Sequence, residues 1–120
     1  MEKIKITGYF INGINEEKIN FNSEGIIKNN IIKYNNDNEE FILKINKDRF
    51  VFNKKNEETI LKYVFTLKNN GESFYKIIEK NLKIYINVLT KSIKIKDNTI
   101  DINFMLENCK SILHIEYEVI

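Results

Sequence analysis

Apolar residues recur at every second position along most of this chain. The clearest runs are Phe41–Ile45, Leu61–Leu67, Leu82–Val88, Ile100–Leu106 and Leu113–Val119. Successive side chains of a β-strand point to opposite faces, so this alternation predicts strands with one buried and one solvent-exposed face. Sheets with a wet face are typically antiparallel, because parallel sheets are covered on both sides. We therefore expect an all-β, antiparallel protein.

Turn signals separate these runs. They include Asn12-Gly13, Asn29-Asn30, Lys47-Asp48, Asn69-Asn70-Gly71 and Asp97-Asn98. Asparagine and glycine tolerate the positive φ angles that tight hairpins need. About ten short strands at hairpin spacing leave no room for crossover helices. We predict a single domain over residues 1–120, an up-and-down antiparallel β-barrel of about ten strands, because closure removes exposed sheet edges. A two-sheet sandwich is the alternative.

The alternation changes phase at two places. Ile19 and Phe21 are odd-numbered, but Ile26 follows Gly25. Between Leu82 and Lys96 the apolar positions are even as far as Val88 and odd from Ile93. A one-residue shift exchanges the two faces of a strand, so we predict a β-bulge or bend at each place.

The last hairpin contains the only cysteine and the only histidine of the chain. With a two-residue turn at Asn108-Cys109, Phe104 faces Leu113 on the core side and His114 faces Asn103 on the other. In that register Asp101 lies opposite Glu116, so the alternative is a metal site made by Asp101, His114 and Glu116. A flat sheet face provides no pocket for a metal. We therefore expect a solvated outer face, without a metal and without catalysis by Cys109.

The charge of the chain is nearly balanced, with 19 basic and 17 acidic residues and a net charge of +2. Isoleucine, lysine and asparagine form half of the sequence, a bias that AT-rich codons produce. A nucleic-acid interface would rest on Lys54, Lys55, Lys91, Lys94, Lys96 and Lys110, with Tyr9 and Tyr85 as stacking platforms. Interleaved glutamates leave no single-sign stripe. We expect no nucleic-acid partner.

Signals for catalysis and targeting are missing from the sequence. There is no glycine-rich phosphate loop, no Cys/His metal spacing and no nucleophile elbow, and the acidic pairs fall at turns. We expect a non-catalytic protein without a cofactor. Residues 1–12 do not read as a signal peptide, and no stretch approaches the roughly 18 apolar residues of a membrane span. A lone cysteine is typical of a reducing compartment, so a cytoplasmic location is expected.

Several segments, taken in order, resemble the YwiB-like family of small bacterial proteins. They are EGIIKNNIIKYNND (Glu24–Asp37), RFVFNKKN (Arg49–Asn56), FYKI (Phe74–Ile77), VLTKSI (Val88–Ile93) and a terminal hairpin ending in HIEYE. The resemblance covers nearly the whole chain. It implies a lipocalin-like (calycin) barrel and, by analogy with other calycins, a ligand cavity, without an assigned activity.

Four residues correspond to polar positions of that family. Tyr34 and Tyr75 match strand tyrosines, Thr90 matches the threonine of a T-K-S-I-like stretch, and Lys54 stands where an arginine is usual. Asn56 replaces the family's turn glycine, and the Lys80-Asn81 turn also lacks one. Lysine lacks the planar fork of arginine, so binding of an anion there is expected to be weaker.

Two functional hypotheses follow. The first is a barrel that accepts a small apolar or amphipathic ligand through Tyr34, Lys54, Tyr75 and Thr90. The aromatic residues Phe10, Phe21, Phe41, Phe50, Phe65, Phe104 and Tyr117 would either line a cavity or fill it. The second is an interaction module, monomer or homodimer, that docks a protein or RNA partner, or a second copy, through an outer face carrying Met105 and Ile112.

Overall fold

The structure is a computed structural model that describes residues 1–68 and 71–120, and it contains strands joined by turns. Its strands are β1 (Glu2–Asn12), β2 (Glu17–Lys28), β3 (Ile31–Asn36), β4 (Glu39–Ile45), β5 (Arg49–Lys55), β6 (Thr59–Thr66), β7 (Ser73–Ile77), β8 (Leu82–Ile86), β9 (Val88–Lys96), β10 (Thr99–Leu106) and β11 (Cys109–Val119). The predicted all-β antiparallel barrel is confirmed, with eleven strands described in place of about ten. Among the same residues, no helix is long and apolar enough to cross a membrane.

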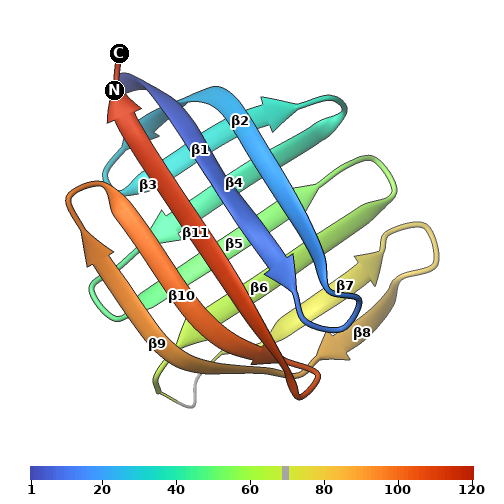
Figure 1. Cartoon of the computed structure of the whole chain (residues 1–120). Helices are drawn as coiled ribbons and strands as arrows, with labels where there is room; N and C mark the ends of the chain where they lie inside the picture. Colours follow the sequence, from blue (N-terminus) through green and yellow to red (C-terminus); the bar gives the residue numbers. More distant parts are fainter. Residues whose placement is uncertain (69–70) are drawn as a thin grey trace.

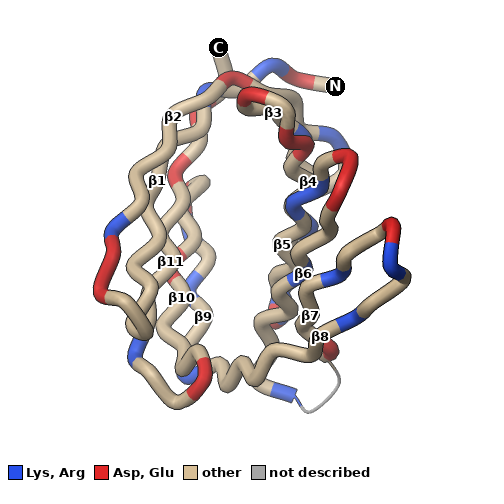
Figure 2. Tube along the Cα trace, turned by 90° about the vertical axis from the view of Figure 1, so that its right-hand side faces the viewer, with Lys and Arg blue, Asp and Glu red and all other residues tan. Residues whose placement is uncertain are grey.

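The strands form one sheet in the order β8-β7-β6-β5-β4-β3-β2-β1-β11-β10-β9, so the first and last strands pair with each other (Figure 1). The edges of the sheet are β8 and β9, which only Asn87 separates along the chain. Strand β9 curls back beside β6, and the β7–β8 hairpin stands away from the barrel wall (Figure 2). The seam of this nearly closed barrel therefore lies between β9 and β6, far from the chain ends.

A side-chain hydrogen bond crosses this seam. The backbone N–H of Thr66 on β6 donates to Oγ1 of the buried Thr90 on β9, at 3.1 Å. No ladder pair joins the two strands among the described residues. Thr90 therefore takes the place of a backbone partner where the sheet does not close.

We expect Thr90→Val to lower the free energy of unfolding by about 1–3 kcal/mol, because a partly buried N–H loses its acceptor while the side-chain volume is kept. Urea denaturation followed by circular dichroism measures this. Thr7→Val, on the outer face of β1, is the matched control and should change stability by no more than about 0.5 kcal/mol. Equal losses in the two variants would show that the seam bond contributes nothing specific.

Several two-residue turns have positive φ angles, as predicted from their asparagines. The angles are 52° and 63° at Asn29-Asn30 and 52° and 61° at Asp97-Asn98. Such angles are those of turns that match the twist of antiparallel strands. Of the turn predicted at Asn69-Asn70-Gly71, the two asparagines lie outside the described residues.

The register of the last hairpin differs from the prediction by two residues. The turn is Glu107-Asn108, where both φ angles are positive, and Cys109 already belongs to β11. Phe104 therefore pairs with Ser111 and not with Leu113, while His114 pairs with Asp101. A shift of two residues leaves every side chain on its expected face, since the period of a strand is two. The partners were wrong, but the faces were right.

One of the two predicted phase breaks is present. In the pairing of β9 with β10, Ser92 lies opposite Asn103 and Thr90 opposite Phe104, which leaves Lys91 as the extra residue of a bulge. There is no bulge at Gly25, because the described pairs of β2 with β1 and β3 continue through it without a shift, and a bend there stays a prediction. The inward positions of β2 include Phe21, Ser23, Gly25 and Ile27. Ser23 and Gly25 are small, and Ile27 packs on the core.

The hydrophobic core lies between the two walls of the barrel, β1, β2 and β9–β11 on one side and β3–β8 on the other (Figure 2). Its buried members are Ile4, Ile6, Ile32, Tyr34, Leu43, Phe50, Phe65, Ile100, Ile102, Phe104, Leu106, Leu113 and Ile115. Those within Phe41–Ile45, Leu61–Leu67, Ile100–Leu106 and Leu113–Val119 occupy the inward positions that the alternation predicts. Phe65 and Phe104 meet across the interior with ring centroids 4.7 Å apart.

Candidate ligand-binding pocket

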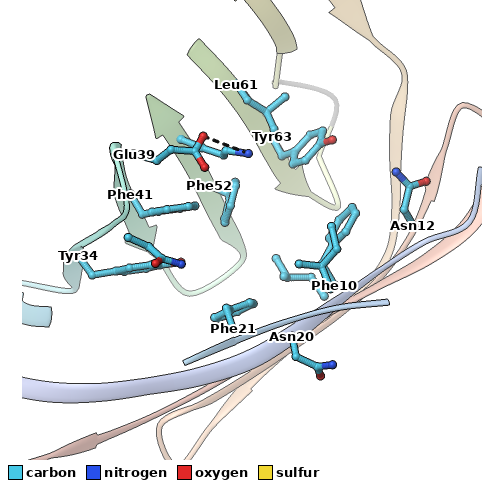
Figure 3. A pocket seen from close by; sticks show the side chains of 14 residues that line it. Phe10, Asn12, Asn20, Phe21, Tyr34, Glu39, Phe41, Phe52, Leu61 and Tyr63 are labelled. Carbon is cyan, nitrogen blue, oxygen red and sulfur yellow. Dashed lines mark ion pairs between the residues drawn. The ribbon is translucent and has the colours of Figure 1, made fainter. Parts of the chain in front are cut away.

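The barrel interior is hollow at one mouth, where a cavity of about 320 Å³ opens between the walls (Figure 3). Strands β1–β6 and β11 supply its lining: Phe10, Asn12, Ile19, Asn20, Phe21, Tyr34, Asn36, Glu39, Phe41, Phe52, Lys54, Leu61, Tyr63 and Leu113. The side chain of Asn20 points away from the cavity, whereas Phe10 and Phe21 extend toward it. The volume lies at the lower end of the range for small-molecule sites.

Six of the fourteen lining residues are aromatic. Tyr34 and Phe41 stack almost in parallel, with centroids 4.6 Å apart and an interplanar angle of 3°. Phe52 meets Phe41 edge to face at 5.9 Å, and Tyr63 stacks on Phe10 at 6.1 Å from the opposite wall. Offset-stacked and edge-to-face contacts of this kind hold rings in defined positions. The wall is therefore a fixed apolar surface.

A charged pair stands at the rim of this cavity. Lys54 Nζ on β5 lies 3.3 Å from Glu39 Oε2 on β4, and the two side chains are 37% and 30% exposed (Figure 3). The polar side chains of Asn12 and Asn36 also line the site. The cavity is thus apolar inside with polar groups at its mouth, which suits a ligand with one apolar and one polar end.

Sequence reasoning missed Glu39 because it treated the acidic pairs as solvated turn residues. The signal was present in the alternation, since Glu39 has the same parity as the inward-facing Phe41 and Leu43. An acidic residue at the first inward position of a strand lies at the rim of the barrel and not in its core. That position is where a ligand's polar end would meet the protein.

Burial changes the acidity of two phenols in this region. Desolvation raises the pKa of Tyr34 well above its ordinary value of 10, and it also raises the pKa of Tyr63. Loss of water around a group disfavours its charged form. Both phenols therefore stay neutral, as hydrogen-bonding groups, throughout the physiological range of pH.

Three of the four residues taken from the family resemblance share one row across the inner face of β3–β7. In this row Phe41 separates Tyr34 from Lys54, and Leu61 separates Lys54 from Tyr75. Tyr34 and Lys54 line the cavity. Tyr75 lies on the flared β7–β8 hairpin and is not part of the lining, and Thr90 lies at the seam. The structure thus brings two of the four together.

The aromatic residues that were expected to line or fill the interior divide into two sets. Phe10, Phe21 and Phe41 line the cavity. Phe50, Phe65 and Phe104 are at most 1% exposed and fill the barrel beyond it, while Tyr117 packs partly buried against the core. Aromatic rings thus line the cavity at one mouth of the barrel and fill the interior around Phe50, Phe65 and Phe104.

His114 lies on the outer face of the sheet, between two carboxylates. Its Nδ1 is hydrogen-bonded to Asp101, and its Nε2 lies 3.3 Å from Glu116 Oε1. Its ring stacks on Tyr9, with centroids 5.1 Å apart. Among residues 1–68 and 71–120, no three histidine, cysteine or acidic side chains are arranged to hold a metal. The arrangement suits a doubly protonated imidazolium that donates to both acids.

We expect the pKa of His114 to lie above its ordinary value of 6.5. Burial of the ring lowers it, but hydrogen bonds and charges from Asp101 and Glu116 together raise it more. The folded protein therefore binds this proton more tightly than the unfolded chain. The resulting stabilisation is fully present below pH 6.5 and is lost as pH rises through the raised pKa.

Because the chain has one histidine, a proton NMR titration of its imidazole gives a single assignable curve. Asp101→Asn should move the midpoint down toward 6.5. Glu118→Gln, which removes an exposed carboxylate two residues beyond Glu116 on β11, is the control and should move it little. A midpoint at or below 6.5 in the unmodified protein would contradict this prediction.

Comparison with known proteins gives a fold and no family. No family model matches the sequence, and no curated protein matches it. The crystal structure of the ywiB protein from Bacillus subtilis is similar, with a TM-score of 0.70, 18% identity, and coverage of 98% of this chain and 89% of that chain. The chain has a YwiB-like fold. Likeness at this identity shows the fold alone, so membership of a lipocalin-like (calycin) family stays a prediction.

Proposed function

We propose that this protein binds a small apolar or amphipathic ligand at the mouth of its barrel, without catalysing a reaction. The observation that carries the proposal is the aromatic-lined cavity of about 320 Å³ with the Lys54–Glu39 pair at its rim. An apolar interior with few polar groups is the usual composition of a small-molecule site. The ligand's ring or chain packs against Phe10, Phe21 and Phe52, and its polar end meets the rim.

The protonation and pairing of the polar groups around the cavity support a binding role and not catalysis. The carboxylate of Glu39 is paired with Lys54, and the buried phenols of Tyr34 and Tyr63 are held neutral. A general acid or base works best with a pKa near the operating pH, and burial moves these phenols away from it. The free thiol of Cys109 supports the proposal of a reducing, cytoplasmic location.

The proposal is tested first by native mass spectrometry of the gently purified protein. We expect an additional mass that disappears on denaturation. A second test uses 1-anilinonaphthalene-8-sulfonate, whose rings fit the aromatic wall and whose sulfonate fits Lys54. We expect saturable binding with one probe per chain.

Two pairs of variants make the probe experiment specific. Leu61→Trp fills the cavity and should abolish binding, while Leu89→Trp, at an exposed position of β9, should leave it unchanged. Lys54→Gln should weaken binding of the sulfonate, and Glu39→Gln should strengthen it by releasing Lys54. A bare mass, together with probe binding that Leu61→Trp does not alter, would refute the proposal.

A further inference from the structure

The outer face of β6–β8 gathers lysines around two aromatic rings. In cross-strand register, Lys62 lies opposite Phe74, and Phe74 lies opposite Tyr85. In the neighbouring row Lys76 lies opposite Lys83. This hairpin stands away from the barrel wall and carries basic positions on its strands, with one acidic and one basic position at its tip (Figure 2). The five residues Lys62, Phe74, Lys76, Lys83 and Tyr85 are called the basic hairpin face below.

Two of the three lysines of this face, Lys62 and Lys83, lie near its rings. Lys83 Nζ lies 4.4 Å from the ring centroid of Phe74 and 5.8 Å from that of Tyr85, and Lys62 Nζ lies 5.9 Å from Phe74. Tyr85 is 62% exposed, although it is a large aromatic residue on a strand. The face therefore presents an open ring beside three positive charges.

Within the described strand pairs, the three lysines of this face have no acidic cross-strand partner, unlike Lys5 and Lys94. Lys5 pairs in register with Glu24 and Glu118, and Lys94 pairs with Asp101. Lys76 and Lys83 instead oppose each other, and like charges directly opposite on a sheet are destabilising. Among the described residues, no carboxylate forms an ion pair with the three lysines of the face. A bound polyanion would relieve this repulsion.

We propose that the basic hairpin face binds single-stranded nucleic acid, with a base stacked on Tyr85 and phosphates held by Lys62, Lys76 and Lys83. Rings interleaved with basic side chains are how proteins hold single strands without reading sequence. The rings distinguish this ligand from an acidic protein, which would need only the charges. The expectation of no nucleic-acid partner rested on the near-neutral net charge and the interleaved glutamates, whereas the register places these three lysines on one face.

The test measures fluorescence anisotropy of a labelled ten-residue oligouridylate at low salt with the full chain. We expect saturable binding that weakens as salt rises, with about two counterions released for three lysine–phosphate contacts. Lys83→Glu should weaken binding at least tenfold. Lys91→Glu, an exposed lysine of β9, is the matched charge control and should weaken it less than threefold.

The stacking ring is tested separately. Tyr85→Thr keeps a strand-forming residue on an exposed edge and should weaken oligouridylate binding about five- to a hundredfold. Its effect on a ten-residue polyglutamate, which has no base to stack, should be small. A blunt RNA duplex should bind less tightly than the single strand, because its bases are already stacked.

Three results would overturn the proposal. They are no binding at low salt, equal losses in Lys83→Glu and Lys91→Glu, or polyglutamate bound as tightly as oligouridylate with no effect of Tyr85→Thr. The last result would mean a surface for an acidic protein. Leu61→Trp, which fills the cavity on the inner face, should leave oligouridylate binding intact, so this proposal and the ligand pocket fail independently.

Discussion

Phe65→Ala should lower the free energy of unfolding by about 3–5 kcal/mol. The side chain of Phe65 has no exposed surface, and its ring lies among Phe104, Tyr63 and Phe50, with centroids 4.7, 5.9 and 6.2 Å away. Removing it leaves a void in the solid part of the barrel that the surrounding strands cannot collapse into. A loss of this size is a large part of the 5–15 kcal/mol typical of a domain.

Urea denaturation followed by tyrosine fluorescence measures this loss, since the chain has no tryptophan. Leu67→Ala, at a position that is 59% exposed, is the control and should cost no more than about 0.5 kcal/mol. Because Phe65 and Phe104 touch, the double variant should be coupled by about 0.5–1.5 kcal/mol relative to the two single variants. A loss below about 1.5 kcal/mol in Phe65→Ala would contradict the solid packing.

Gly8→Ala is expected to cost about 3 kcal/mol, although it adds only a methyl group. Gly8 is an inward position of β1 between Phe21 on β2 and Ile115 on β11. A Cβ there would lie 2.6 Å from Cζ of Phe21 and would also meet the backbone carbonyl oxygen of His114. The carbonyl cannot move without disturbing the pairing of β1 with β11, so the strain is not easily relieved.

The same change should weaken the ligand pocket, because Phe21 lines it and its ring must move away from a new methyl group. Chemical denaturation measures the stability, and the naphthalenesulfonate probe measures the pocket. Phe21→Leu added to Gly8→Ala should recover the part of the loss caused by the ring, but not the part caused by the carbonyl. Thr7→Ala, one residue away on the outer face, is the control. Wild-type stability in Gly8→Ala would contradict this prediction.

Two of the four residues named from the sequence as ligand-binding lie in the candidate site, and their role stays a prediction. Tyr34 and Lys54 line the cavity, and both were named from family positions. Glu39 was overlooked, although it lies at an odd-numbered position of β4, like the inward-facing Phe41 and Leu43. Thr90 was named as a ligand-binding residue, yet its hydroxyl group accepts a hydrogen bond across the seam. A polar residue on an inward face can serve either a ligand or the fold, and only its neighbours across the sheet distinguish the two roles.

The alternation of apolar residues determined the fold class and the two faces of the strands. Its period of two is a local property, so it survives an error of two residues in a hairpin register, as at Phe104 and Leu113. The asparagine pairs determined tight turns for the same local reason, through their tolerance of positive φ.

Long-range contacts decided the rest. The pairing of β1 with β11, the seam at Thr90 and the flared β7–β8 hairpin depend on how the whole sheet twists and curls. Whether an inward ring lines a cavity, as Phe41 does, or fills one, as Phe65 does, depends on the distance to the opposite wall. Alternation along a strand determines which face a side chain is on, but it does not determine the distance from that face to the opposite wall of the barrel.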